Sequence, residues 1–158
     1  MIEIEIESGD WLAVLPATES VVERAATAAL GETAGDVVVL LTDDAAVKDL
    51  NHRFRDKDRP TNVLSFPGGD MPHIPGSGPG APVHLGDIVL AFGVCRDEAI
   101  EQGKSLENHL THLVVHGVLH LLGRDHEDEA EAEAMEAEER TLLASLGVAD
   151  PYVLPNDL

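Results

Sequence analysis

The sequence has one cysteine, few aromatic residues and no long apolar run, and each shortage excludes a class of protein. The single cysteine, Cys95, rules out an internal disulfide and any metal site built from several thiolates. Aromatic residues make up 3% of the 158 residues, so the core must be built from aliphatic side chains. The sequence does not start with the basic and then apolar residues typical of a signal peptide. No apolar run approaches the length of a membrane span. We therefore expect a soluble cytoplasmic protein without membrane partners, in one domain covering residues 1–158.

Basic residues are also scarce, because 10 Lys and Arg face 30 Asp and Glu and the formal net charge is −20. Such a surface repels nucleic acid at long range. The charges are unevenly distributed, however. Eight acidic and no basic residues lie between Glu127 and Glu139, which we interpret as the solvated face of a helix. Four of the ten basic residues lie between Arg53 and Arg59, and this distribution weakens the objection to a nucleic-acid partner.

Histidines are concentrated in one stretch of the chain. His112, His116 and His120 are spaced four residues apart, which places them on one face of a helix. Gly123 is a natural helix end, so the chain can turn there and bring His126 back toward the others. We predict that His116, His120 and His126 bind one Zn²⁺ ion with its fourth position open, as in catalytic sites. His112 either orients one of these ligands or is a core histidine.

The same spacing, glycine included, occurs in H-E-x-x-H-x-x-G-x-x-H metalloproteases, with one difference. Gly117 stands where those enzymes carry the glutamate that acts as general base. We therefore expect a zinc hydrolase whose chemistry is not that of a standard peptidase. A metallopeptidase-like hydrolase remains the alternative that the spacing itself supports.

Hydrophobic patterns predict four strands and five helices. The strands are expected at 2–6, 36–41, 62–66 and 84–91. Three helices are expected at 17–30, 94–102 and 127–146. A fourth helix is expected from an N-cap at Thr42 to about Phe54, and a fifth, which carries the histidines, from an N-cap at Ser105. Their order predicts an α+β fold: a mixed four-stranded sheet packed with about five helices, the metal-binding helix buried at the centre. The Gly- and Pro-rich residues 67–83 are predicted to form a flexible loop beside the site.

Two further polar residues each allow two interpretations. Arg55 either belongs to a solvated, charged loop balanced by Asp56 and Asp58, or binds a phosphate through its planar guanidinium. Asp87 either bonds a loop or orients a zinc-binding imidazole.

Three motifs carry a resemblance to a known family. They are N-x-x-[FY]-R-x-K-D-x-P-T-[DN]-V-L-S-F-P from Asn51, Leu-Gly-Asp-Ile-Val at 85–89, and H-G-x-L-H-L-x-G-x-D-H from His116. Together they resemble the YbeY family of bacterial endoribonucleases, and the similarity extends to the Asp-Pro-Tyr at 150–152. The chain departs from the family at Arg124, where tyrosine is common.

The resemblance implies a single-strand-specific, metal-dependent endoribonuclease. Such an enzyme matures ribosomal RNA, notably the 3′ end of the small-subunit RNA, and takes part in ribosome quality control. By position, the resemblance implies that His116, His120 and His126 are the zinc ligands and that Arg55 is catalytic. The implied partners are single-stranded or ribosomal RNA and the ribosome or its small subunit. An alternative from another class is a non-catalytic, ribosome-associated factor with a structural zinc.

Overall fold

One mixed sheet of four strands organises the structure. The computed structural model describes residues 2–68, 84–123 and 128–148. The strands lie in the spatial order β1-β2-β4-β3. β1, β2 and β4 run parallel to one another, and β3 pairs antiparallel with β4 at the edge of the sheet. Their bounds are β1 (Ile2–Ile6), β2 (Asp36–Thr42), β3 (Val63–Pro67) and β4 (His84–Ala91).

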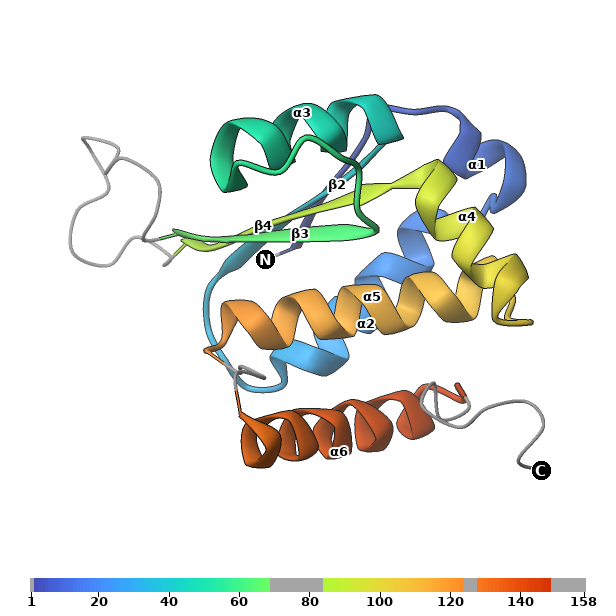
Figure 1. The fold of residues 1–158 in the computed structure, drawn as a ribbon. Coiled ribbons are helices and arrows are strands. Elements are labelled where there is room, and N and C mark those ends of the chain that lie inside the picture. Colours follow the sequence, from blue (N-terminus) through green and yellow to red (C-terminus); the bar gives the residue numbers. More distant parts are fainter. Residues whose placement is uncertain (1, 69–83, 124–127, 149–158) are drawn as a thin grey trace.

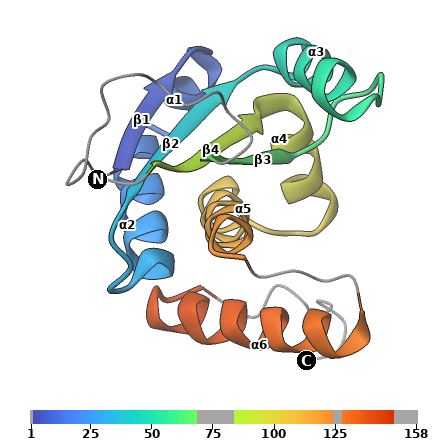
Figure 2. The ribbon, with the colours of Figure 1, turned by 90° about the vertical axis from the view of Figure 1, so that its left-hand side faces the viewer.

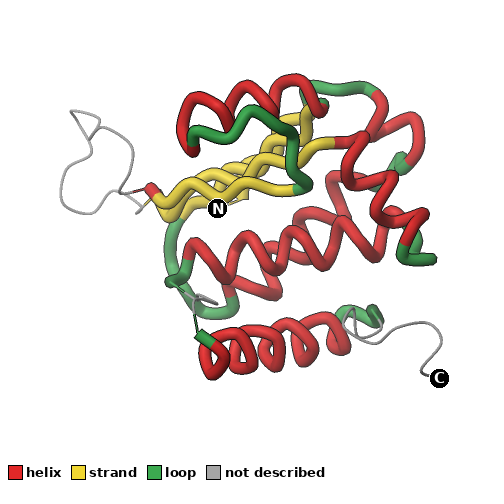
Figure 3. The backbone as a smooth tube through the Cα atoms, viewed as in Figure 1, coloured by secondary structure: helices red, strands yellow, loops and turns green. Residues whose placement is uncertain are grey.

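Helices cover both faces of this sheet. The described part of the chain contains α1 (Asp10–Val14), α2 (Thr18–Leu30), α3 (Asp44–Arg55), α4 (Phe92–Glu101), α5 (Leu106–Leu121) and α6 (Glu129–Ser145). α3 lies on one face, whereas α2 and α5 lie side by side on the other, with α6 packed outside α5 (Figures 1 and 2). Figure 3 shows the resulting layers in order: α3, the sheet, the pair α2 and α5, and finally α6. None of these helices has the length and apolar character needed to cross a membrane.

The central strand β4 contributes to the core on both sides of the sheet. Ile88 and Leu90 are fully buried in the larger core, which also contains side chains of α2 and α5. Val89 and Ala91 point the other way and pack with Val47 of α3 in a smaller core. A strand covered by helices on both faces needs apolar residues at successive positions, which explains its unbroken hydrophobic run.

The predicted fold class is confirmed. The structure has a mixed four-stranded sheet, and α5, which carries the histidines, lies between the sheet and α6 (Figure 2). It has six helices among the described residues where about five were expected, because the short helix α1 was not predicted. α1 is five residues long, too short for a helical hydrophobic period, and is anchored by the buried Trp11. The Trp11 indole donates a hydrogen bond to the carbonyl of Thr42 at 3.0 Å.

Two local predictions around α3 are wrong. Thr42 ends β2, and Asp43 is the N-cap instead, because its carboxylate accepts the backbone N–H of Ala46 at 2.8 Å. Arg55 belongs to the last turn of α3, not to a loop, because the helix continues until Asp56 takes the left-handed cap conformation at φ 56°. The predicted loop at 67–83 begins one residue too early, because Pro67 ends β3. From residue 69 on it lies outside the described residues and stays a prediction.

Candidate metal centre and its cleft

Two histidines of α5 direct their Nε2 atoms toward the same point. The Nε2 atoms of His116 and His120 are 3.0 Å apart, and their ring centroids are 4.5 Å apart. The helix begins at Ser105, whose side chain accepts the N–H of Asn108, and its regular turn places these residues one above the other. Two ligands of one tetrahedral zinc ion, with bonds of about 2.0–2.1 Å, lie about 3.3 Å apart. The two nitrogens therefore already have nearly the spacing that a shared ion requires.

Glu139 of α6 contacts two histidines of α5. The side chain is fully buried. Its Oε1 lies 2.5 Å from Nδ1 of His116, and its Oε2 lies 3.5 Å from Nε2 of His112. Because the carboxylate holds Nδ1 of His116, the Nε2 atom of that ring is directed toward His120. A carboxylate on the far nitrogen of a ligating imidazole fixes the ring and strengthens it as a ligand.

His112, His116 and Glu139 also form a group that can hold a metal ion. Their ligand atoms lie within 4.8 Å of one another. This group shares only His116 with the predicted ligand set. The third predicted ligand, His126, lies outside the described residues.

A cleft of about 310 Å³ opens beside the paired histidines. His116 and His120 line it together with Arg55 of α3 and residues of β3. The Nη2 atom of Arg55 donates to the carbonyl of Ser65 at 2.6 Å, and the guanidinium carbon lies 5.4 Å from the centroid of the Phe66 ring. These two contacts orient the cation along the edge of β3. The fold therefore brings Arg55 and two of the predicted zinc ligands to one cavity.

The electrostatics at this end of the molecule favour cations. The C-terminal ends of α3 and α5 lie on the same side of the structure, with β3 between them (Figure 1). A helix C-terminus carries a partial negative charge from its unpaired carbonyl groups. Arg55 at the end of α3 and His120 near the end of α5 are placed where this charge stabilises a positive group or a bound cation.

Gly117 allows α5 to approach the sheet closely beside the cleft. A Cβ atom at this position would lie 3.1 Å from two side-chain atoms of Ile88 and 3.3 Å from the hydroxyl of Ser65. That hydroxyl donates to the carbonyl of Gly117 at 3.4 Å. A glutamate here, the general base of the metalloproteases, would need the Ile88 and Ser65 side chains to shift by a few tenths of an ångström. The tight packing at Gly117 thus favours a residue without a side chain.

Two other polar side chains have partners away from the histidine pair. Asp87 pairs with His84 on the same strand, at 3.2 Å between Oδ1 and Nε2, whereas Glu139 is the carboxylate that meets His116. Both interpretations of Asp87 stay predictions, because His126 lies outside the described residues. Burial raises the pKa of the Cys95 thiol far above its usual range, with the carboxylate of Glu98 adding to the shift. Cys95 therefore stays protonated and is no nucleophile.

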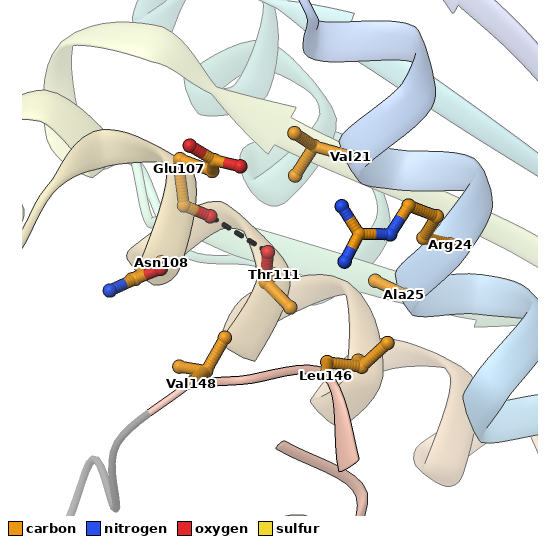
Figure 4. Close-up of a pocket in the computed structure, with 8 residues that line it drawn as sticks. All are labelled: Val21, Arg24, Ala25, Glu107, Asn108, Thr111, Leu146 and Val148. Atoms are coloured by element: carbon orange, nitrogen blue, oxygen red, sulfur yellow. Dashed lines mark hydrogen bonds between the residues drawn. The ribbon is translucent and has the colours of Figure 1, made fainter. Parts of the chain in front are cut away.

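A second, much smaller cavity of about 30 Å³ lies between α2, α5 and the segment after α6 (Figure 4). Arg24 and Glu107 line it, and the hydroxyl of Thr111 donates to the carbonyl of Glu107 at 2.8 Å. The space is enough for one or two water molecules. Its lining among the described residues includes no histidine, so the larger cleft is the site of interest.

A family model described as Endoribonuclease YbeY matches residues 4–147 of the chain. The chain belongs to this endoribonuclease family. Curated proteins called Endoribonuclease YbeY from a Chelativorans species, Paramagnetospirillum magneticum and Azorhizobium caulinodans are 53%, 49% and 46% identical to it. The matches cover 96%, 96% and 98% of this chain and 92%, 94% and 97% of the relatives. The family resemblance inferred from the three motifs is therefore confirmed.

The solution structure of a Thermotoga maritima protein has a similar fold. It is 26% identical to this chain, has a TM-score of 0.53, and is matched over 93% of this chain and 92% of its own. Membership of an endoribonuclease family implies a hydrolase whose substrate is RNA. In this family member Arg55, His116 and His120 line one cleft.

Glu139 is the residue of this YbeY family member that the sequence interpretation missed. It lies in the acidic run interpreted as a solvated face, yet its side chain is fully buried. The signal was present in the periodicity of α6, because Glu139 falls on the same helical face as the buried Met135 and Leu143. A carboxylate in the apolar stripe of an amphipathic helix needs a partner, and here the partners are histidines.

Proposed function

We propose that this protein is a cytoplasmic, single-strand-specific, zinc-dependent endoribonuclease. Its proposed role is the maturation of ribosomal RNA, notably the 3′ end of the small-subunit RNA, and ribosome quality control in association with the ribosome or its small subunit. The observation that carries the proposal is the cleft, where Arg55 faces two histidines whose Nε2 atoms are 3.0 Å apart, in a chain of the endoribonuclease family.

The donor set fits one zinc ion. The converging imidazoles of His116 and His120 have the chemistry and spacing that tetrahedral zinc prefers, and the carboxylate of Glu139 holds the far nitrogen of His116. His116, His120 and His126 would hold the ion. When bound, zinc supplies Lewis-acid activation of water and of a phosphoryl oxygen.

The remaining chemistry belongs to side chains of the cleft. Arg55 binds the phosphate undergoing cleavage and neutralises the charge that builds on its oxygens. A guanidinium has five N–H donors, and the bond to Ser65 uses one of them, so others are available for the phosphate. The Ser65 carbonyl and the Phe66 ring keep the guanidinium directed along β3, so it needs little reordering when RNA binds.

The peptidase alternative is disfavoured by the packing at Gly117. A side chain at that position would press on Ile88 and Ser65, and glycine itself offers no group that could take a proton. The alternative of a non-catalytic factor with structural zinc predicts ribosome binding without RNA cleavage, whereas the open cleft beside the histidines favours catalysis.

The test combines metal analysis with cleavage of matched single-stranded and duplex RNA and of ribosomal RNA precursors. We expect about one zinc per chain and cleavage confined to single-stranded RNA. His116→Ala and His120→Ala should lose both tight zinc binding and cleavage. His112→Ala should weaken zinc binding without abolishing it.

The variants also decide between the two metal arrangements. If His120→Ala keeps its zinc and His112→Ala loses it, the ion is bound by the His112, His116 and Glu139 group and the proposed ligand set is wrong. Full cleavage activity in metal-free His116→Ala protein would contradict zinc dependence altogether.

A further inference from the structure

The aromatic side chains of the described residues form two pairs with opposite environments. Trp11 and Phe92 are buried in the core, with ring centroids 5.2 Å apart. Phe54 and Phe66 form the second pair, at 5.6 Å and an interplanar angle of 68°. Phe54 is 64% exposed and is the one aromatic among the large hydrophobic residues that the described chain leaves exposed. In a protein with so few aromatic residues, we would expect each aromatic ring to lie in the core, so an exposed ring needs an explanation.

The exposed ring is continuous with the cleft. Phe54 precedes Arg55, whose guanidinium lies against the ring of Phe66 and lines the cleft with His116 and His120. Phe66 follows Ser65, another lining residue. An aromatic face, a cation and the histidine pair are thus adjacent at one end of the molecule.

The local charge identifies the kind of ligand that this ring would meet. Arg53, Arg55, Lys57 and Arg59 lie in or directly after the last turn of α3, and all four are exposed. They form the basic part of a chain whose net charge is −20. Exposed cations beside an exposed aromatic ring are the combination that binds single-stranded nucleic acid, the cations following the phosphates and the ring stacking on a base.

We propose that Phe54, supported edge-on by Phe66, is a stacking platform for one base of the RNA strand, next to the phosphate bound by Arg55. This inference rests on the proposed function and adds a residue that selects the substrate. A base in a duplex is already stacked on both sides and cannot offer its face to Phe54. Stacking on Phe54 therefore gives a physical reason for a preference for single strands.

The test measures RNA binding in the His116→Ala background, so that the result does not depend on cleavage. Fluorescence anisotropy gives Kd for a single-stranded RNA oligonucleotide and for a series in which one nucleotide at a time is abasic. Phe54→Leu keeps the apolar contact with Phe66 but removes the aromatic face. We expect it to bind intact RNA roughly tenfold more weakly, whereas Phe54→Trp retains or improves affinity.

The abasic series identifies stacking specifically. At one position, loss of the base should weaken binding to protein with Phe54 by a similar factor and leave the affinity of Phe54→Leu unchanged. Ile100→Ala is the matched control, because Ile100 is 72% exposed on α4, and it should bind like the parent. Phe54→Tyr, which retains a ring, provides a second variant if Phe54→Leu has a lowered Tm.

Three results would overturn the proposal. Unchanged affinity of Phe54→Leu, or equal sensitivity of both proteins to every abasic position, would exclude a stacked base. Loss of RNA affinity in Phe54→Ala but not in Phe54→Leu would assign the ring to an apolar contact, as with a protein partner. If the wild-type protein cleaves RNA while Phe54→Leu binds normally, the platform is wrong and the endoribonuclease function stands. If the wild type neither binds nor cleaves RNA, the proposed function itself fails.

Discussion

Single atoms decide what the residues of this site can do. The two nitrogens of the His116 imidazole have different partners, Glu139 on Nδ1 and His120 on Nε2. One buried carboxylate therefore orients the ring so that its other nitrogen faces the cleft. Arg55 is oriented in the same way, by one carbonyl and one aromatic ring. The orientation of both side chains at this scale is set by these supporting contacts.

Replacing Arg55 should separate catalysis from metal binding. Arg55→Ala is expected to lower the cleavage rate roughly 10²–10³-fold, because the charge on the transition state is no longer neutralised. Zinc content should not change. Arg55→Lys should restore little activity, since an ammonium cannot make two parallel hydrogen bonds to a phosphate. Single-turnover cleavage and metal analysis check this expectation.

Arg53→Ala is the matched control for Arg55. It removes a cation two residues earlier that pairs with Asp49 at 3.2 Å, so cleavage should change much less. Equal losses in the two variants would mean that general charge, not the position of Arg55, is what matters.

Replacing Glu139 by glutamine should weaken zinc binding. Gln keeps the volume and a hydrogen-bonding group but removes the charge that holds His116, and such supporting partners contribute about 10–100-fold in metal affinity. Competition with a chromogenic chelator measures the change. Glu133→Gln, an exposed change on the same helix, should bind zinc like the wild type. An unaltered zinc affinity in Glu139→Gln would show that the carboxylate has no part in the site.

At the scale of the helix, α5 connects the layers of the molecule. One side packs on the sheet at Gly117, and another meets α6 through Glu139. Near its start, His109 is buried against α4, with Nε2 2.9 Å from Oε1 of Glu98. The histidine pair is therefore held by a helix that is fixed along its length, which suits a site that must keep its geometry.

The contact between α4 and α5 should make stability depend on pH. Burial lowers the pKa of His109 from its ordinary value of 6.5, against the opposing effect of Glu98. The unfolded chain then takes up the proton first, so stability is full above pH 6.5 and falls as the pH drops from 6.5 toward the lowered pKa. Urea unfolding at pH 7.5 and 5.5 measures this loss. His109→Gln, which does not titrate, should lose less stability than the wild type, and an equal loss would contradict the assignment.

At the scale of the whole molecule, opposite charges are kept apart. Acidic residues dominate α6, whereas basic residues gather around the end of α3, beside the cleft. The net charge of −20 repels RNA from most of the surface. The segment from Arg53 to Arg59 has four basic and two acidic residues, so an RNA strand that approaches the histidines along it meets less repulsion.

RNA binding should consequently weaken with salt in spite of the acidic surface. If about three phosphates are neutralised, raising NaCl from about 50 to 200 mM should weaken binding roughly 20-fold, because counterions are released. Lys57→Ala should make this dependence shallower by the equivalent of about one phosphate contact. Arg96→Ala, on α4, serves as the control for loss of a cation elsewhere. Affinity that rises with salt would mean that long-range repulsion dominates binding.

Much of the secondary structure could be predicted because it depends on sequence patterns that span only a few residues. The period-2 and apolar runs predicted the four strands, and glycines such as Gly31 and Gly123 predicted helix ends. The spacing of His116 and His120 was enough to place them together, since a helix has one geometry. By contrast, α1 escaped prediction because one and a half turns carry no measurable period.

The sequence alone determined the family, the strands and helices, and the pairing of two histidines, because motifs and helical spacing act over a few residues. Only the tertiary structure decided that Glu139 is buried against His116 and that Arg55 lines the same cleft as the histidines. It also decided that Phe54 stays exposed beside that cleft. These contacts join residues far apart in the chain, and their existence depends on how α3, α5 and α6 pack around the sheet, which no local pattern encodes.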